Sequence, residues 1–187
     1  MIPPSLPDDE STRLADLHAL AVLDTAPEER FDRLTRVART LFDMPLALVS
    51  LVDADRQWVK SGAGTYLPES SRETSFCGHA ILSDDLMVVP DTAADPRFHD
   101  NPLVAGDPYV RFYVGRPLKV NGRSRVGTLC LMDTRPREFG ADQHFTGRSG
   151  ADGGTGADGG LHGDYRSLDR FAQPPGFRAA CQPESAR

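Results

Sequence analysis

One apolar stretch in the first half of the chain decides the fold: Leu46-Ala47-Leu48-Val49-Ser50-Leu51-Val52. Its apolar residues occupy odd and even positions alike, as expected for a strand that is covered on both faces. Asp53-Ala54-Asp55 then supplies turn residues, and residues 56–60 mix polar, aromatic and β-branched side chains. We therefore predict a central strand that is joined to an antiparallel partner as a hairpin.

Two helices are predicted ahead of this strand. Leu14, Leu17 and Ala21 repeat at helical spacing and predict a first helix over residues 13–24. The tetrapeptide Thr25-Ala26-Pro27-Glu28 has the pattern of a capping box with proline in the first turn. It predicts that the second helix begins there.

Three further strands are predicted after the hairpin, at residues 87–90, 110–120 and 126–132. The last two are separated by Asn121-Gly122, the pair best suited to a type I′ turn. A sixth strand at the sheet edge is compatible with the loop region 62–69. Helices followed by mostly antiparallel strands indicate the α+β class.

The chain divides into three regions by composition. Residues 1–12 form a Pro-rich N-terminal lead, and residues 13–139 carry every predicted element. Residues 140–187 hold more than half of the 17 glycines and only Leu161 and Leu168 as large aliphatic residues. Such a segment buries too little apolar surface to fold, so we predict a disordered tail, with a frameshifted remnant of a closing helix as an alternative origin.

Charge and cysteine content limit the partners and the location. The net charge of −6 and the absence of a basic cluster argue against nucleic acid. The longest apolar stretch is far shorter than the ~20 residues that span a bilayer, so no membrane anchor is predicted. Cys77, Cys130 and Cys181 are an odd number at wide spacing, and the acidic start is unlike a secretory signal. These features predict a cytoplasmic protein.

Several short motifs follow one another in a fixed order along the chain. They are LAVLDTAPEERFD at residues 20–32, SFCGHAI at 75–81, DPRF at 95–98, NPLV at 101–104, RFYVGRPL at 111–118 and GTLCLMD at 127–133. Together they resemble a GAF domain of the bacterial sensor type, the kind found ahead of histidine kinases and diguanylate cyclases.

The resemblance implies a mostly antiparallel sheet of about six strands, with N-terminal helices on one face and a loop-covered pocket on the other. It implies a domain that binds a small molecule or a protein and modulates signal transduction without catalysis of its own. A homodimer and a downstream signalling output domain or protein are its expected partners. The C-terminal helix that normally passes the signal onward has no counterpart in the glycine-rich tail.

By the same resemblance, a ligand pocket is expected between the segment 76–81, the loop 97–104 and the last two strands. The expected ligand-binding residues are Phe76, Cys77, His79, Ile81, Arg97, Phe98, Arg111, Tyr113, Thr128 and Cys130. Two readings stay open for this set, because the side chains either surround a ligand or fill the cavity themselves. The arginines either clamp a ligand carboxylate or brace a neighbouring aspartate.

Cys77 and His79 also admit other chemistry. With His99 and Cys130 they would offer thiolate and imidazole ligands to zinc, but the spacing is not that of a structural zinc site, so no metal is predicted. Relatives that attach a bilin carry adjacent cysteine and histidine, whereas Gly78 intervenes here, and no cofactor is predicted. The alternatives to a sensor are a thiol-dependent enzyme that uses Cys77 and His79, and a ligand-free dimerisation module.

Overall fold

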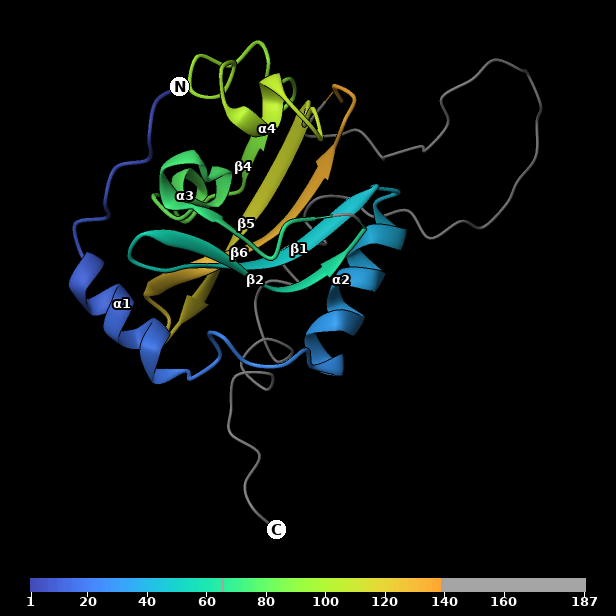
Figure 1. The fold of residues 1–187 in the computed structure, drawn as a ribbon. Coiled ribbons are helices and arrows are strands. Elements are labelled where there is room, and N and C mark those ends of the chain that lie inside the picture. The colour runs from blue at the N-terminus through green and yellow to red at the C-terminus, as the bar shows by residue number, and fades with distance from the viewer. Residues whose placement is uncertain (65, 139–187) are drawn as a thin grey trace.

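A six-stranded antiparallel sheet organises the protein in a computed structural model that describes residues 1–64 and 66–138 (Figure 1). The elements are α1 (Glu10–Ala19), α2 (Glu29–Leu41), β1 (Leu46–Val52), β2 (Arg56–Ala63), β3 (Glu69–Ser71), the 3-10 turn η1 (Arg72–Thr74), α3 (Phe76–Ala80), β4 (Met87–Val89), α4 (Pro102–Ala105), β5 (Phe112–Val120) and β6 (Ser124–Asp133). The strand order is β3-β2-β1-β6-β5-β4, and every neighbouring pair is antiparallel. The predicted α+β class is confirmed.

Strand β1 lies in the centre of the sheet, between β2 and β6, as its sequence predicts. Ala47, Val49 and Leu51 point into a core that also contains side chains of α1 and α2. Leu48 and Val52 point into a second core on the α3 side. Because each face of β1 is covered by a different layer, apolar residues are needed at odd and even positions alike.

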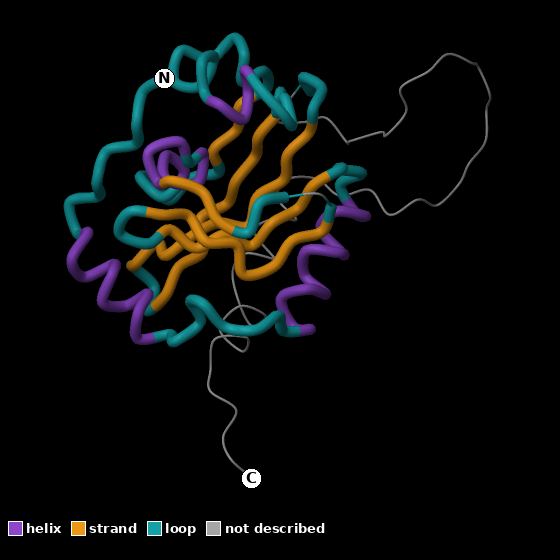
Figure 2. The backbone as a smooth tube through the Cα atoms, viewed as in Figure 1, coloured by secondary structure: helices purple, strands orange, loops and turns teal. Residues whose placement is uncertain are grey.

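The helices divide between the two faces of the sheet (Figures 1 and 2). Helix α1 packs on β6, and α2 packs on β2 and β1. Helix α3 lies on the opposite face, against β5, β6 and β1. The site expected from the sequence therefore lies between α3 and the middle strands.

Three helix boundaries differ from their predictions, the first being the start of α1, which lies at Glu10 instead of residue 13. Helix α1 ends at Ala19 because Ala21 and Asp24 adopt left-handed backbone conformations, with φ of 50° and 57°, that no α-helix continues through. The capping box at Thr25 is wrong. Helix α2 begins at Glu29, while the Thr25 hydroxyl donates to the Val22 carbonyl instead.

The hairpin predictions are confirmed. Strands β1 and β2 pair around residues 53–55, and Asn121 and Gly122 both take positive φ, 54° and 72°, in the turn between β5 and β6. The sixth strand is β3 (Glu69–Ser71), at the sheet edge beside β2, and it begins where the expected region 62–69 ends. The tail predicted for 140–187, with its alternative origin, lies outside the described residues and stays a prediction.

Candidate functional site

Helix α3 is a single short helix, and a buried polar chain fixes its start. The Ser75 hydroxyl accepts a hydrogen bond from the Gly78 amide at 2.9 Å and donates to the Gln57 side chain. The Gln57 amide nitrogen donates to the Ser50 hydroxyl at 3.3 Å. Because these bonds join α3 to β2 and β1 away from water, the helix is held at a fixed position on the sheet.

A thiol cluster, defined as Cys77, Tyr113, Thr128 and Cys130, lies where α3 packs on β5 and β6. Thr128 Oγ1 donates to Cys77 Sγ at 3.0 Å, and the Tyr113 hydroxyl donates to the same sulfur at 3.5 Å. The two sulfur atoms are 3.8 Å apart, and all four side chains are fully buried. Three neighbours therefore converge on one thiol.

These contacts change the acidity of the cluster. Burial by itself raises the pKa of Cys77, but the hydrogen bonds from Cys130, Thr128 and Tyr113 outweigh burial and lower this pKa to about 7. Burial and the neighbouring sulfur raise the pKa of Tyr113, which therefore stays a neutral donor. The negative charge of the cluster is best held by Cys77.

An aromatic layer closes the space beside the thiols. The ring of Phe76 lies 4.6 Å from that of Phe98 and stacks at 5.2 Å on that of Tyr113, measured between centroids. Ile81 is buried in the same core. The side chains expected to surround a ligand thus pack against one another in this structure.

His79 and Arg97 form the outer edge of this layer. The His79 ring meets Phe98 edge-on at 5.0 Å, and the Arg97 guanidinium lies 4.9 Å over the same ring. Arg97 also makes a two-pronged ion pair with Asp95, at 3.0 and 2.6 Å. Burial lowers the pKa of His79, although its bond to a backbone carbonyl acts in the opposite direction.

Arg111 is not brought to this edge. Its guanidinium makes a two-pronged ion pair with Asp91 at 2.9 and 2.7 Å, at a partly exposed position. This is the bracing arrangement that the sequence left open. Arg72, which lies outside the expected set, pairs with Glu10.

An N-terminal strap, defined as residues 1–6, lies across α3, and the blue trace in Figure 1 passes beside that helix. The Ile2 amide donates to the Arg97 carbonyl at 3.1 Å, and His79 Nε2 lies 2.9 Å from the Ile2 carbonyl oxygen. A Cβ at Gly78 would lie 2.8 Å from Pro4, so the strap approaches α3 too closely for any side chain there. Composition alone marked this segment only as a lead, because contacts to distant loops leave no local signal.

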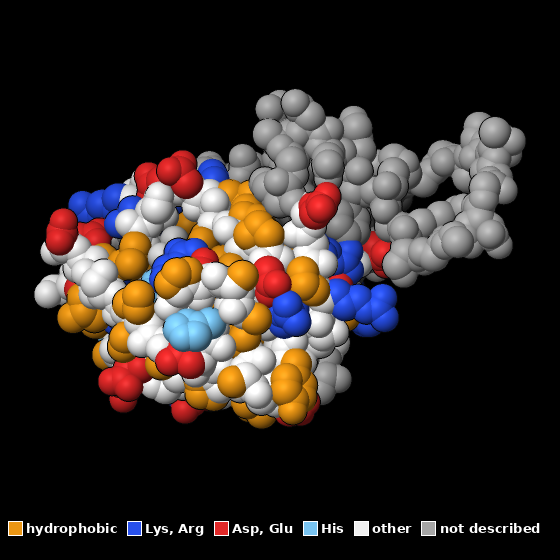
Figure 3. Space-filling model, turned by 90° about the horizontal axis from the view of Figure 1, so that it is seen from above, with side chains coloured by type: hydrophobic (Ala, Val, Ile, Leu, Met, Phe, Trp, Pro, Cys, Tyr) orange, Lys and Arg blue, Asp and Glu red, His pale blue; other side chains and the backbone are white. Residues whose placement is uncertain are grey.

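A groove of about 530 Å³ lies along the inner side of the strap. It is lined by Pro3, Pro4, Leu6, Ala54, Asp55, Ser71, Arg72 and Glu73. The groove joins the strap to the β1–β2 turn and to η1, at the foot of α3. Seen from the α4 end (Figure 3), acidic, basic and apolar side chains are interspersed over the described surface.

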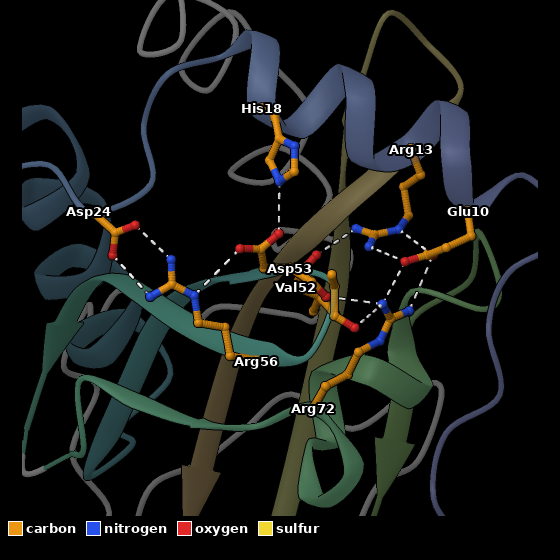
Figure 4. A network of polar contacts seen from close by, with 9 residues as sticks. Glu10, Arg13, His18, Asp24, Val52, Asp53, Arg56 and Arg72 are labelled. Carbon is orange, nitrogen blue, oxygen red and sulfur yellow. Dashed lines mark hydrogen bonds and ion pairs between the residues drawn. The ribbon is translucent and has the colours of Figure 1, made fainter.

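An ionic network ties α1 to the same region (Figure 4). Arg13 is fully buried, and it donates to the Val52 carbonyl at 2.6 Å and to both Glu10 oxygens at 2.8 Å. Arg72 of η1 donates to the same carboxylate at 2.5 and 3.2 Å, and to the Asp53 carbonyl at 3.0 Å. Glu10 therefore bridges α1 and η1.

The charge of Glu10 is strongly favoured in this position. Burial alone would raise its pKa, but hydrogen bonds from Arg13 and Arg72 outweigh burial and lower the pKa to about 2. Sequence reasoning missed this residue because its partners are far away along the chain. An acidic residue three positions before an arginine was the one local signal.

A second arm of the network reaches the β1–β2 turn. His18 Nε2 lies 2.8 Å from the Asp53 carboxylate, and Arg56 Nε donates to that carboxylate at 3.4 Å. Arg56 also holds Asp24, at 2.6 and 3.0 Å. The turn that follows the central strand is thus fixed to the segment after α1.

Of the four residues considered as zinc ligands, Cys77 and Cys130 lie together, but neither histidine joins them. His79 faces the Ile2 carbonyl, and His99 lies exposed beside Asp100, 3.7 Å away. Within residues 1–64 and 66–138, no three His, Cys, Asp or Glu side chains gather as metal ligands. In the same part of the chain no helix has the length and apolar character to cross a bilayer.

Comparison with known proteins identifies the same family that the motifs in the sequence resemble. The family model of the GAF domain matches residues 26–146. A Pseudomonas aeruginosa protein named cyclic di-GMP phosphodiesterase PA2567 is 39 % identical over 137 residues, which cover 73 % of this chain and 23 % of that protein. The chain therefore spans about a quarter of the length of this curated relative.

This relative overturns one prediction. The sequence predicts a protein that is not an enzyme, whereas the protein that matches at 39 % identity is named a phosphodiesterase. The prediction that the protein is not an enzyme is therefore contradicted.

A solved GAF domain matches at the level of the fold. The GAF domain of an Acinetobacter phosphoenolpyruvate-protein phosphotransferase superposes with a TM-score of 0.51 and 14 % identity, over 69 % of this chain and 81 % of that one. A free methionine-R-sulfoxide reductase from Neisseria meningitidis gives 0.49 and 19 %, over 75 % and 84 %.

Proposed function

Because the chain belongs to the GAF domain family, a sensory and small-molecule-binding fold, we propose that it binds a small molecule under the N-terminal strap and so modulates cyclic di-GMP turnover. The output resides in other parts of a larger signalling protein or in a partner. A homodimer and a cytoplasmic location belong to the same proposal, as do a histidine kinase or a diguanylate cyclase as alternative outputs.

Similarity supports the choice of cyclic di-GMP signalling. The relative at 39 % identity is named a cyclic di-GMP phosphodiesterase, and the match covers 23 % of it. A domain of this size that recurs in a much longer phosphodiesterase is well placed to regulate it.

The observation that carries the ligand proposal is the strap over α3. The strap is held there by the backbone hydrogen bond from Ile2 to Arg97, by the bond between the His79 ring and the Ile2 carbonyl, and by an ion pair between the Met1 amino group and the exposed Asp100. Exposed ion pairs contribute about 0–1 kcal/mol, so the strap is cheap to displace. Its departure would uncover the His79 ring and the Arg97 backbone.

The uncovered groups define the ligand class. The His79 ring nitrogen, which now meets the Ile2 carbonyl oxygen, would donate to a carbonyl or carboxylate oxygen of the ligand. The Arg97 guanidinium, which lies over the Phe98 ring, would stack on a flat part of the ligand. We therefore expect a small, flat molecule with at least one oxygen acceptor.

The strap also offers a route to the rest of the domain. It leads directly into α1, whose Glu10 is bound to Arg72 at the foot of α3. Displacing the strap would strain this connection, which joins both faces of the sheet. A ligand at α3 thereby gains an effect on α1, the helix on the opposite face.

Native mass spectrometry of the full 187-residue chain tests the binding step. We expect the variant Ile2→Pro, which lacks the amide that donates to Arg97, to retain a small molecule from the cell more fully than the wild type. Ile2→Val keeps the amide and the carbonyl of residue 2, and with them both hydrogen bonds, so it serves as the matched control. Equal occupancy in all three proteins would contradict a site beneath the strap.

A chimera tests the output. The matching segment of the Pseudomonas aeruginosa phosphodiesterase is replaced by this chain, and the rate of cyclic di-GMP hydrolysis is measured with and without Ile2→Pro. We expect the variant to change the rate at least several-fold in cell extract. An unchanged rate in an active chimera would remove the regulatory proposal.

A further inference from the structure

We propose that Cys77 and Cys130 form a dithiol site that a small hydroperoxide oxidises to a buried disulfide. The sulfur atoms already face one another at 3.8 Å, across the contact between α3 and β6. The sulfur–sulfur distance in a disulfide bond is about 2.05 Å, so the two sulfur atoms need to approach by less than the width of one atom. This inference does not depend on the proposed ligand site.

Cys77 is the thiol that reacts first. Thr128 and Tyr113 both donate hydrogen bonds to its sulfur, at 3.0 and 3.5 Å, and so stabilise the thiolate that attacks an oxidant. These bonds also lower the pKa of Cys77, whereas the pKa of Cys130 is raised by its bond to Cys77 and by burial. Cys130 is then the thiol that resolves the first product.

Burial selects the class of oxidant. Both thiols have no exposed surface. For thiol–disulfide exchange with oxidised glutathione, a disulfide sulfur of that bulky peptide has to come into contact with the buried thiolate. Hydrogen peroxide is close to water in size and uncharged, so it can enter through small fluctuations of α3 and the strap.

The reaction balances without another cofactor. The Cys77 thiolate attacks one peroxide oxygen, an S–O bond forms, the O–O bond breaks, and the leaving hydroxide takes up the thiol proton as water. Cys130 then loses its proton and attacks the Cys77 sulfur, which forms the S–S bond and expels hydroxide as a second water. Two thiols are oxidised to a disulfide, and one peroxide is reduced to two waters.

Oxidation would change the contacts of α3. A disulfide sulfur is a much weaker acceptor than a thiolate, so Thr128 and the Tyr113 hydroxyl would lose their charged acceptor. The new bond would draw α3 towards β6 and away from Pro4, which touches Gly78 in the reduced state. The oxidation state of the two cysteines thereby affects how closely the strap packs on α3.

Peptide mapping of the full chain tests the proposal. The Cys181→Ser background removes the third cysteine, and trypsin places Cys77 in peptide 73–97 and Cys130 in peptide 126–137, since Pro136 protects the bond after Arg135. After hydrogen peroxide, we expect these two peptides to elute joined and lighter by two hydrogen atoms, and to separate on reduction. Oxidised glutathione at the same concentration should leave them apart.

Two single variants test the order of events. In Cys130→Ser we expect hydrogen peroxide to leave a sulfenic acid on Cys77, which dimedone traps when it is added together with urea, since the folded protein shields this sulfur. In Cys77→Ser we expect Cys130 to give no dimedone adduct under the same conditions. Thr128→Val should slow formation of the joined peptide several-fold, because the hydrogen bond from Thr128 lowers the pKa of Cys77 and its loss leaves less thiolate, and Thr128→Ser should restore the rate.

Three outcomes would overturn the inference. They are no joined peptide from the folded protein, a joined peptide only after unfolding in urea, and oxidation by glutathione disulfide as fast as by peroxide. Circular dichroism of each variant shows that it is folded. Ligand retention in the Ile2 variants is a separate measurement, so failure of either proposal leaves the other open.

Discussion

At the scale of single residues, the packing around Tyr113 depends on the absence of a side chain at Gly115. A Cβ at Gly115 would lie 2.2 Å from the Tyr113 hydroxyl oxygen and 2.7 Å from the ring carbon that bears it. The hydroxyl therefore has one position, from which it donates to Cys77 at 3.5 Å. A small change in β5 would reach the thiol cluster through this ring.

We predict that Gly115→Ala lowers the free energy of unfolding by about 1–3 kcal/mol, because the ring has no free volume to move into. Urea denaturation followed by fluorescence measures the change. The control is the double variant Gly115→Ala with Tyr113→Phe, which removes the closest atom and should recover part of the loss. A single variant as stable as the wild type would show that the ring adapts freely.

The candidate site could be predicted only in part. The structure brings together Phe76, Cys77, Ile81, Phe98, Tyr113, Thr128 and Cys130. Helical and strand periodicity, with the resemblance to GAF domains, points to this face. Arg111 could not be judged in the same way, because whether a guanidinium faces a cavity or a neighbouring Asp91 is decided by tertiary contacts.

At the scale of elements, Glu10 joins α1 to η1 by accepting from two arginines at once. Arg13 is fully buried and Arg72 nearly so, and both direct their guanidinium groups at this carboxylate. Removing one partner from a buried ionic group leaves charges uncompensated. A substitution at Glu10 therefore measures how much this network contributes to holding α1 on the domain.

We predict that Glu10→Gln costs about 3 kcal/mol of unfolding free energy at pH 7, because Arg13 and Arg72 lose their counter-charge. Asp8→Asn changes a nearby exposed carboxylate and is the control. Thermal unfolding of the three proteins measures the difference. A loss as small as that of the control would mean that water replaces the carboxylate easily.

The same network predicts a pH dependence. The pKa of Glu10 is lowered in the folded protein from 4.5 to about 2, so its contribution is complete above 4.5 and is lost as the pH falls through 2. The stability difference between the wild type and Glu10→Gln should therefore shrink between pH 4.5 and pH 2. Urea midpoints across that range provide the measurement, and a constant difference would contradict the assignment.

The ends of α1 show why element boundaries resist prediction. Apolar spacing continues to Ala21, yet the helix ends at Ala19 and begins at Glu10. The start is favoured by the buried Arg13, which only the folded structure reveals, and the end is imposed by left-handed residues. Periodicity identifies the helix correctly, whereas tertiary contacts choose its limits.

At the scale of the whole molecule, β1 is held between two separate cores. Leu51 belongs to the core under α1 and α2, and Leu48 belongs to the core under α3. A domain with a single covered face would tolerate truncation on the other. Here the packing on both faces of β1 contributes to the stability of the whole domain.

We predict that Leu48→Ala and Leu51→Ala each cost about 2–5 kcal/mol of unfolding free energy, the range for truncating a buried leucine. Leu67→Ala, at a residue that is 64 % exposed, is the control and should change little. Chemical denaturation of the three variants measures the costs. A mild effect at Leu48 alone would mean that the α3 face is loosely packed, against the two-sided reading of β1.

The strand order has a consequence for how the protein is made. The central pair, β1 with β6, joins the first strand of the described residues to the last. During synthesis β1 and β2 can form their hairpin early, but one long side of β1 stays open until residue 133 has left the ribosome. For that interval an apolar central strand acts as an unpaired sheet edge, the feature most prone to aggregation. Slow translation through residues 72–123 would prolong the exposure, and a chaperone that recognises extended apolar segments would be most needed there.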